Sequence, residues 1–181
     1  MSSVNRSSIK RGAGVYQQNI LTKKIKLPYN SVGSNILENI QLKLIETLSG
    51  KCIKGGYVKT GSIQVLSHSA GVVKDVSVEF VAVFQCLICN PVEGQRIRTI
   101  VKNITKAGAR CETMEDISPV VVFIARDHNF KNKNFANLKN GDPAIVRVIG
   151  TRFELNDSYI SVIGELVSPK KIRRTRIVVK Q

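Results

Sequence analysis

The chain of 181 residues contains 43% hydrophobic and 23% charged residues, a composition typical of a folded protein rather than a disordered one. Its 28 basic and 13 acidic residues give a formal net charge of +15, an excess that attracts polyanions such as nucleic acid. No run of 18 apolar residues occurs, which excludes a membrane-spanning helix, and the polar start Met1–Lys10 lacks the apolar core of a secretory signal. We therefore expect a protein that is not secreted and whose four cysteines are thiols.

Most of the excess positive charge lies at the two ends of the sequence. Residues 1–30 hold six basic and no acidic residues, as do residues 168–181, whereas residues 31–93 hold five of each. We interpret residues 1–14 as a mobile basic tail and residues 168–181 as a second one, in which Ile177–Val179 is a candidate extra strand. These ends either solubilise the protein or contact phosphate or an acidic protein surface.

The sequence that follows the first tail predicts a strand and then a helix. Val15–Leu27 alternates loosely between apolar and basic residues, as a half-exposed strand does, and Pro28 ends it. Ser34 is a candidate N-cap for a helix whose apolar residues recur at three- and four-residue steps up to Leu48. Gly50 is the expected glycine after the C-terminus of that helix.

After Cys52 the apolar period changes to two. Val76–Ile88 predicts a long strand that passes from a half-exposed to a buried position. Asn90–Gly94 has the composition of a turn and is the candidate domain boundary. Residues 15–91 therefore predict a small α+β domain with one helix on an antiparallel sheet.

The sequence after the boundary predicts an all-β domain over residues 92–167. Turn signals separate five short runs with the composition of strands, and a longer polar excursion follows the third. Five short strands in about 72 residues fit a small closed barrel of the oligonucleotide-binding (OB) type. The runs are Gln95–Ile104, Ala109–Glu112, Val120–Ala125, Ala144–Thr151 and Tyr159–Leu166. The predicted fold class is therefore α+β and mainly β.

The sequence offers no catalytic constellation. Neither His68 nor His128 lies in a known metal or nucleophile motif, and Asp127 beside His128 lacks a partner set for acid–base catalysis. Cys86 and Cys89 form a CxxC pair without a second pair to complete a zinc site, in a run where strand alternation points them to opposite faces. We interpret the pair as core packing and expect no metal, no cofactor and no enzyme activity.

What remains is binding chemistry on residues 92–167. Barrels of this type hold single strands in a basic groove with aromatic side chains as stacking platforms. Basic residues are numerous here but aromatic ones are few, and Phe123 and Phe153 are each either stacking platforms or core residues. The candidate RNA-binding residues, each of which is alternatively a solvated surface residue, are Lys102, Lys106, Arg110, Phe123, Arg126, Arg147 and Arg152.

Residues 92–167 resemble an S1-type RNA-binding domain in residues 93–97, 103–108 and 122–126. The closing segments Val148–Arg152 and Ile163–Leu166 are more specific. They are similar to the end of the S1 domain in the stalk subunit of RNA polymerase, which is the seventh subunit of eukaryotic RNA polymerase II and the archaeal E-type subunit. The front half agrees in its order of strand, helix, glycine pair and long strand, so the resemblance covers roughly residues 17–167.

The resemblance implies a non-catalytic role. In that family the first domain is a tip that docks on the polymerase core, a smaller partner (the fourth subunit in eukaryotes) binds along both domains, and the S1 domain contacts emerging single-stranded RNA. The resemblance thereby implies a nuclear protein, or one of a cytoplasmic factory or virion if the chain is a large-DNA-virus homologue. By the same resemblance, the residues expected to meet the core are Lys51, Lys54, Gly55, Gly56, Tyr57 and His68.

Three features depart from the family pattern, and one of them is the excursion over residues 126–143, which lacks family-like detail. Both basic tails are additions, so their role is not inherited. Ala109 stands where S1 domains often carry an aromatic residue on the binding face, which predicts weak base stacking.

Two other functions fit parts of the sequence. One is a free-standing S1-type RNA-binding protein of translation or RNA processing, and the other is an RNA-processing enzyme that captures substrate through the barrel. The balanced charge of residues 31–93 favours a protein-docking domain and hence the polymerase subunit. The missing catalytic set disfavours the enzyme.

Overall fold

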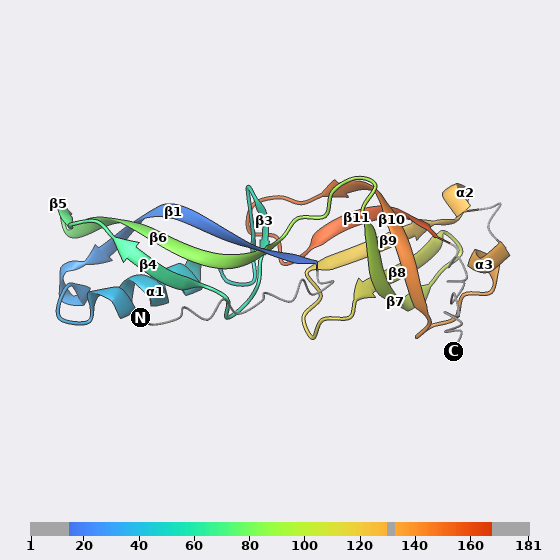
Figure 1. The fold of residues 1–181 in the computed structure, drawn as a ribbon, viewed down its shortest axis with the longest axis horizontal. Coiled ribbons are helices and arrows are strands. Elements are labelled where there is room, and N and C mark those ends of the chain that lie inside the picture. The colour runs from blue at the N-terminus through green and yellow to red at the C-terminus, as the bar shows by residue number, and fades with distance from the viewer. Residues whose placement is uncertain (1–14, 130–132, 168–181) are drawn as a thin grey trace, which may run out of the picture. The chain divides into compact units, whose positions relative to one another are not determined.

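The computed structural model describes residues 15–129 and 133–167. Both predicted basic tails, and Ile177–Val179 with them, lie outside the described residues. The chain divides into two compact units (Figure 1). The first, here called the N-terminal unit, comprises residues 1–49 and 58–90, and the second, the barrel unit, comprises residues 50–57 and 91–181.

Two long antiparallel strands organise the N-terminal unit. β1 (Tyr16–Pro28) pairs with β6 (Ser77–Cys89) along the whole length of both, and they run side by side in Figure 1. β4 (Gln64–His68) and β5 (Val72–Lys74) also pair with β6. Every second residue of β6 from Val78 to Ile88 is buried, which is the period-two pattern that predicted the strand.

The α-helix among the described residues of this unit, α1 (Ile36–Leu48), contacts β1 and β4. It buries Ile40, Leu44 and Leu48, which are four residues apart and therefore lie on one face. The expected N-cap is wrong by one residue: Asn35 is the N-cap, and its side chain makes no capping hydrogen bond. Gly50 has φ 71°, which confirms the glycine predicted after the helix. A short 3-10 turn, η1 (Tyr29–Ser31), joins β1 to the helix.

Residues 50–57 belong to the barrel unit and are hydrogen-bonded to a distant loop of that unit. β2 (Cys52–Ile53) pairs with β3 (Gly56–Val58), with Gly56 at φ 122°. The backbone N–H of Cys52 donates to the carbonyl of Asp157 at 2.8 Å, and the N–H of Asn156 donates back to the carbonyl of Cys52 at 2.9 Å. This reciprocal pair joins the segment to the loop before β11.

Five strands of the barrel unit close on themselves, which confirms an α+β fold with an OB-type barrel. The sequence predicted all five, with ends that differ by at most one residue. Each pair is antiparallel except β9 with β11, and the order around the barrel is β10, β11, β9, β8, β7. The strands are β7 (Arg96–Ile104), β8 (Gly108–Thr113), β9 (Val120–Ala125), β10 (Pro143–Arg152) and β11 (Ile160–Leu166).

The predicted polar excursion between β9 and β10 contains two short helices, α2 (Arg126–Asn129) and α3 (Lys133–Ala136). Asn129 is buried, and both the donor and the acceptor of its side-chain amide attach α2 to the barrel. Its Nδ2 donates to the carbonyl of Ala125, and its Oδ1 accepts from the N–H of Leu166, each at 2.9 Å. A buried polar side chain whose donor and acceptor are both used stabilises the local fold instead of destabilising it.

All four cysteines are buried. Burial, with a smaller contribution from the Asp157 carboxylate, raises the pKa of Cys52 to about 11. Burial also raises the pKa of Cys111 to about 11 and the pKa of Cys86 above its usual value. In the part of the chain that the structure describes, no three His, Cys, Asp or Glu side chains are grouped to hold a metal ion. No helix among those residues has the length and apolarity to cross a membrane.

Candidate nucleic-acid interface

A row of register partners crosses the outer face of the barrel. Asn103 on β7 lies opposite Arg110 on β8, Arg110 opposite Phe123 on β9, and Phe123 opposite Ile163 on β11. All four are exposed. On β9 and β11 the adjacent residues are buried, as strand alternation requires, whereas a register shift between Val101 and Asn103 leaves both Lys102 and Asn103 exposed on β7. Phe123 is 43% and Ile163 is 51% exposed, which is unusual for large apolar side chains at the middle of a sheet.

These residues line an open hollow of about 420 Å³, within the size range of small-ligand sites. The hollow lies over β8 and β9 and reaches the β7–β8 turn at Thr105 and Ala107. His128 of α2 also lines it. The face formed by the second and third strands of an OB barrel, with its first loop, is where such barrels bind oligonucleotides, and β8, β9 and this turn occupy those positions.

Gly108 lets two strands approach closely beside the hollow. A Cβ on this residue would overlap the backbone carbonyl oxygen of Ile124, the nearest atom. The neighbouring Ala109 is 3% exposed and lies opposite Ile124. Ala109 lines the hollow, but its small and buried side chain offers no ring on which a base could stack. In this barrel the aromatic side chain of that face comes from Phe123.

Four of the predicted basic residues lie at or next to the hollow. Arg110 lines it, and its Nη2 lies 3.1 Å from Oε1 of Glu112. Lys102 and Lys106 are exposed on β7 and in the β7–β8 turn, and the described part of the chain records no ion pair for either. Arg126 follows Ala125 of the hollow, and its guanidinium carbon lies 5.9 Å from the centre of the Phe135 ring.

The other two predicted arginines are on β10 and do not line the hollow. Arg147 forms a hydrogen-bonded ion pair with Glu165 of β11. Arg152 is highly exposed, and its Nη2 lies 3.6 Å from Oε1 of Glu154. Sequence reasoning missed Asn103, His128 and Ile163, although strict alternation along β11 from the buried Ile160 indicates that Ile163 faces outward.

The residues expected to dock on a polymerase core do not gather on one surface of one unit. Gly56 and Tyr57 are buried, and Tyr57 is only 2% exposed. Lys54 and Gly55 are exposed at the β2–β3 turn, and Lys51 is half-buried, all in the barrel unit. His68 belongs to the N-terminal unit, where its ring meets that of Phe80 edge-on at 5.9 Å.

A second exposed surface lies on the β5–β6 hairpin of the N-terminal unit, here called the hairpin patch: Val72, Val73 and Val76. Their side chains are 57%, 66% and 82% exposed. The hairpin turns at Asp75, whose φ of 50° is unusual for a residue other than glycine.

Glu79 of β6, opposite Val72, bridges Lys74 at 3.1 Å and Lys24 at 3.8 Å. The hydrogen bond from Lys74 lowers the pKa of Glu79. Sequence reasoning did not single out the hairpin patch, because three valines near a turn also fit a buried strand end.

The class of protein follows from the fold: it is an α+β chain whose larger unit is an OB-type barrel with an exposed Arg–Phe–Ile row across β8, β9 and β11. No protein-family profile matches the chain. It is nevertheless similar along most of its length to curated RNA polymerase subunits, which confirms the resemblance expected from the sequence.

Two of these relatives are plant proteins and one is viral. The DNA-directed RNA polymerase II subunit 7 of Arabidopsis thaliana is 22% identical over 173 residues, 81% of this chain and 95% of that protein. The subunit RPB7 of Glycine max is also 22% identical, with the same shares. A putative DNA-directed RNA polymerase subunit of Acanthamoeba polyphaga mimivirus is 24% identical over 84% of this chain and 82% of that protein.

Among solved structures, an uncharacterized protein from Methanocaldococcus jannaschii is 21% identical and covers 45% of this chain and 99% of its own, at a TM-score of 0.36.

Proposed function

We propose that this chain is a non-catalytic stalk subunit of a DNA-dependent RNA polymerase. In this role the N-terminal unit docks on the polymerase core, and the barrel contacts the emerging RNA. The similarity to subunit 7 of RNA polymerase II, which covers 95% of the plant proteins, supports the assignment to a polymerase. The polymerase is either a nuclear one or, as the viral relative indicates, one that a virus encodes. The corresponding location is the nucleus or a viral replication site.

The observation that carries RNA contact is the row Arg110–Phe123–Ile163 on the binding strands of the barrel. A base has a flat apolar face that stacks on an exposed aromatic ring, and the neighbouring guanidinium is suited to the phosphate. Lys102, Lys106 and Arg126 add positive charge around the same hollow. With one ring in the hollow and several cations around it, binding is salt-sensitive and weakly selective for sequence.

The observation that supports docking on a protein is the hairpin patch. The three valines of this hairpin expose apolar side chains to solvent, which does not stabilise the chain on its own. Exposed apolar surface of this kind is typical of the centre of a protein interface. The exposed Lys54, Gly55 and half-buried His68 remain candidates for further contacts with the core. A smaller stalk partner is a second protein ligand of this proposal.

Purification of a tagged chain from its native source, with mass spectrometry of what stays bound at moderate salt, tests the proposal. Large polymerase subunits and one small partner are the expected result. Ribosomal proteins or RNA alone would contradict it and would establish a free-standing RNA-binding protein.

A matched pair of variants sharpens this test. In the double variant Val72→Asp and Val76→Asp, we expect loss of the polymerase subunits with unchanged RNA binding, because the two changes place charge on the hairpin patch. Leu155→Asp is the control, since Leu155 is 61% exposed and belongs to the barrel unit, not to the unit that carries the patch. Equal loss from both variants would show that the patch has no special role.

A further inference from the structure

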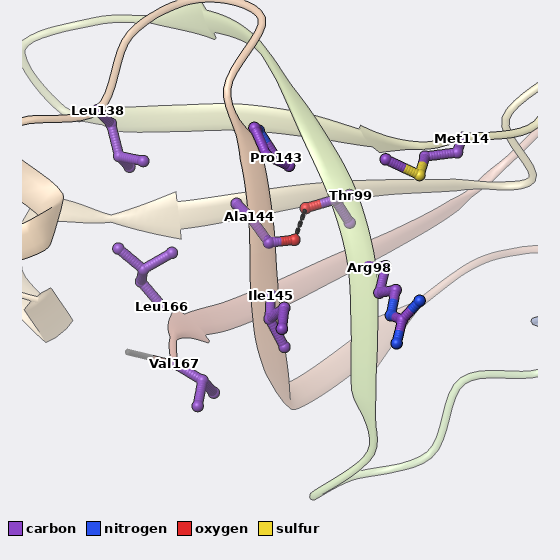
Figure 2. Close-up of a pocket in the computed structure, with 9 residues that line it drawn as sticks. All are labelled: Arg98, Thr99, Met114, Leu138, Pro143, Ala144, Ile145, Leu166 and Val167. Carbon is purple, nitrogen blue, oxygen red and sulfur yellow. Dashed lines mark hydrogen bonds between the residues drawn. The ribbon is translucent and has the colours of Figure 1, made fainter. Parts of the chain in front are cut away.

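The two units differ in how the edges of their strands are used. The five strands of the barrel unit close on themselves, so none of them has an open edge. Backbone groups beside a second hollow of the barrel, of about 560 Å³, are also paired (Figure 2). There the carbonyl of Ala144 accepts from Oγ1 of Thr99 at 3.1 Å, the dashed line of Figure 2. The barrel therefore offers no place for a further strand.

The N-terminal unit does have an open edge, on β1. This strand pairs with β6 over 13 residues without a register shift, and no other described strand pairs with it. A mean strand has about 5–6 residues, so this edge is long. A long open edge presents a row of backbone N–H and C=O groups with which another chain can pair.

The hydrogen bonds of β6 show which backbone groups of β1 are available. The carbonyl of Val81 accepts from the N–H of Ser69, which follows β4, at 2.9 Å. The carbonyl of Leu87 accepts from the N–H of Lys59, which follows β3, also at 2.9 Å. The odd-numbered residues of β6 thus bond on the side away from β1, and its even-numbered residues bond to β1.

The register then fixes the orientation along β1. The even-numbered residues of β6 lie opposite the odd-numbered residues of β1, which therefore carry the hydrogen bonds between the two strands. The N–H and C=O groups of the even-numbered residues of β1 point the other way, to the open side. These residues, all of them exposed, are Gln18, Ile20, Thr22, Lys24 and Lys26.

The two halves of this edge differ in charge. From Tyr16 to Thr22, β1 has no charged residue, and Ile20 in this half is 64% exposed. The second half carries three lysines and ends at Pro28. Lysine and proline are the residues with which proteins protect an edge against pairing. The uncharged half lacks this protection and is where a strand can be added.

A row of glutamine side chains leads to the same half of β1. Gln85 of β6 donates to Oε1 of Gln64 of β4 at 2.6 Å. Its own Oε1 accepts from Nε2 of Gln18 at 2.9 Å. Rows of side-chain amides continue from strand to strand in stacked sheets. Because this row ends at the open edge, Oε1 of Gln18 is placed to accept a hydrogen bond from an added strand.

Charge determines which chain can pair here. Glu79 of β6 lies opposite Lys26, and its carboxylate lies 3.8 Å from Nζ of Lys24 and 3.1 Å from Nζ of Lys74. One carboxylate thus serves three lysines, so acidic residues on an added strand are attracted to this end of the edge. A second copy of the chain would instead bring the same lysines and a net charge of +15.

We infer that the open edge of β1 is a protein-binding site that takes up an extended strand of a partner chain. The partner strand has uncharged residues beside Gln18–Thr22 and acidic residues beside Lys24 and Lys26. Main-chain hydrogen bonds supply the affinity of such a contact, and the side-chain pairs supply its selectivity. The site shares no residue with the hairpin patch or with the Arg–Phe–Ile row. It does not depend on the assignment to a polymerase, because it rests on the backbone of β1.

Amide hydrogen exchange, measured by NMR on the full ¹⁵N-labelled chain, tests this inference residue by residue. In the free chain the N–H groups of Ile20 and Thr22 should exchange fast, and that of Leu21, which faces β6, slowly. The probe is a synthetic peptide of about eight residues, an ordinary strand length, that alternates valine and threonine and ends in two glutamates. At about 90% occupancy it should slow Ile20 and Thr22 about tenfold, because exchange continues only in the free chains, and leave Leu21 unchanged.

A pair of variants and a second peptide locate the effect. Ile20→Lys adds a lysine to the unprotected half of the edge and should abolish the slowing at Thr22. Leu42→Lys is the control, since Leu42 is also 64% exposed but belongs to α1, and this variant should bind the peptide as the unchanged chain does. A peptide with two lysines in place of the glutamates should bind more weakly than the acidic peptide.

Three results would overturn the inference. The first is that the acidic peptide, at millimolar concentration, leaves the exchange of Ile20 and Thr22 unchanged. The second is slow exchange of Ile20 in the free chain, which would show that the edge is already covered, by a second copy if the protection is lost on dilution. The third is equal protection by a single-stranded oligonucleotide, which would identify a nucleic-acid surface instead.

Discussion

Arg110 and Phe123 face each other as register partners across β8 and β9, and both side chains project from the outer face of the barrel. The pair places a cation next to an exposed aromatic ring on strands that cannot shift independently, because the barrel is closed. This rigid surface can therefore hold one nucleotide at two points, with its base on the Phe123 ring and its phosphate near the Arg110 guanidinium.

Phe123→Ala should weaken binding of single-stranded RNA by about 1–3 kcal/mol, which is the contribution of one stacked base. Because Phe123 is 43% exposed, the change should have little effect on the unfolding midpoint. Fluorescence anisotropy with a labelled oligonucleotide measures the first and thermal unfolding the second. Tyr159→Ala is the control, since Tyr159 is 40% exposed in the same unit but does not line the hollow. Equal losses in the two variants would exclude stacking on Phe123.

Removing Lys102 and Lys106 together should reduce the salt dependence of RNA binding. Each lost phosphate contact to a single strand lowers the slope of log K against log salt by about 0.7. The measurement is a series of titrations between low and moderate salt. Lys26→Ser with Lys54→Ser removes the same net charge from β1 and from the β2–β3 turn, which are not part of the row, and should leave the slope almost unchanged. A slope equal to that of the wild type in the Lys102 and Lys106 variant would place the phosphate contacts elsewhere.

Gly108→Ala should destabilise the barrel by about 1–3 kcal/mol, the usual cost of overpacking. Its Cβ would overlap the carbonyl oxygen of Ile124, a backbone atom that cannot move without bending β9. Gly150→Ala is the control, because no atom lies within 4 Å of its added Cβ, and we expect a change within about 0.5 kcal/mol. Urea unfolding of both variants gives the comparison, and a neutral Gly108→Ala would show that the strands have room to separate.

The buried thiols predict a loss of stability at alkaline pH. The fold raises the pKa of Cys111 from 9.0 to about 11 through burial, which the hydrogen bond with Thr99 partly offsets. A group with a raised pKa contributes its full stability below the unfolded value, and this contribution is lost as the pH rises from about 9 to about 11. Urea midpoints between pH 8 and pH 10.5 should therefore fall, and less steeply in Cys111→Ala. Equal slopes in the two proteins would show that the Cys111 thiolate forms without cost.

The order of the elements was predictable because each carries its own local pattern. The strand β9 spans Val120–Ala125, the same range as the apolar run that predicted it. The helix α1 ends at Leu48, before Gly50, as expected. The exposure of Phe123 was not predictable, because Val121 on the same outer face is only 3% exposed. Five successive apolar residues then conceal which of them faces solvent.

The parts that could not be predicted depend on contacts between distant residues. The pair of hydrogen bonds between Cys52 and the loop at Asn156 and Asp157 assigns residues 50–57 to the barrel unit, and no local pattern encodes it. Conversely, His68 was grouped with Tyr57 from the resemblance alone, and the structure assigns it to the other unit.

The pairing of β1 with β6 also constrains when the chain folds during synthesis. Tyr16 meets Cys89 and Pro28 meets Ser77, so the first strand has no partner until nearly half of the chain has left the ribosome. α1 and the β2–β3 hairpin are local and precede residue 77, but an isolated 13-residue helix is marginal in water, and so is an isolated two-stranded hairpin. The N-terminal unit therefore completes its sheet in one late step, and a nascent chain arrested before residue 77 leaves β1 as an unpaired edge that chaperones must protect.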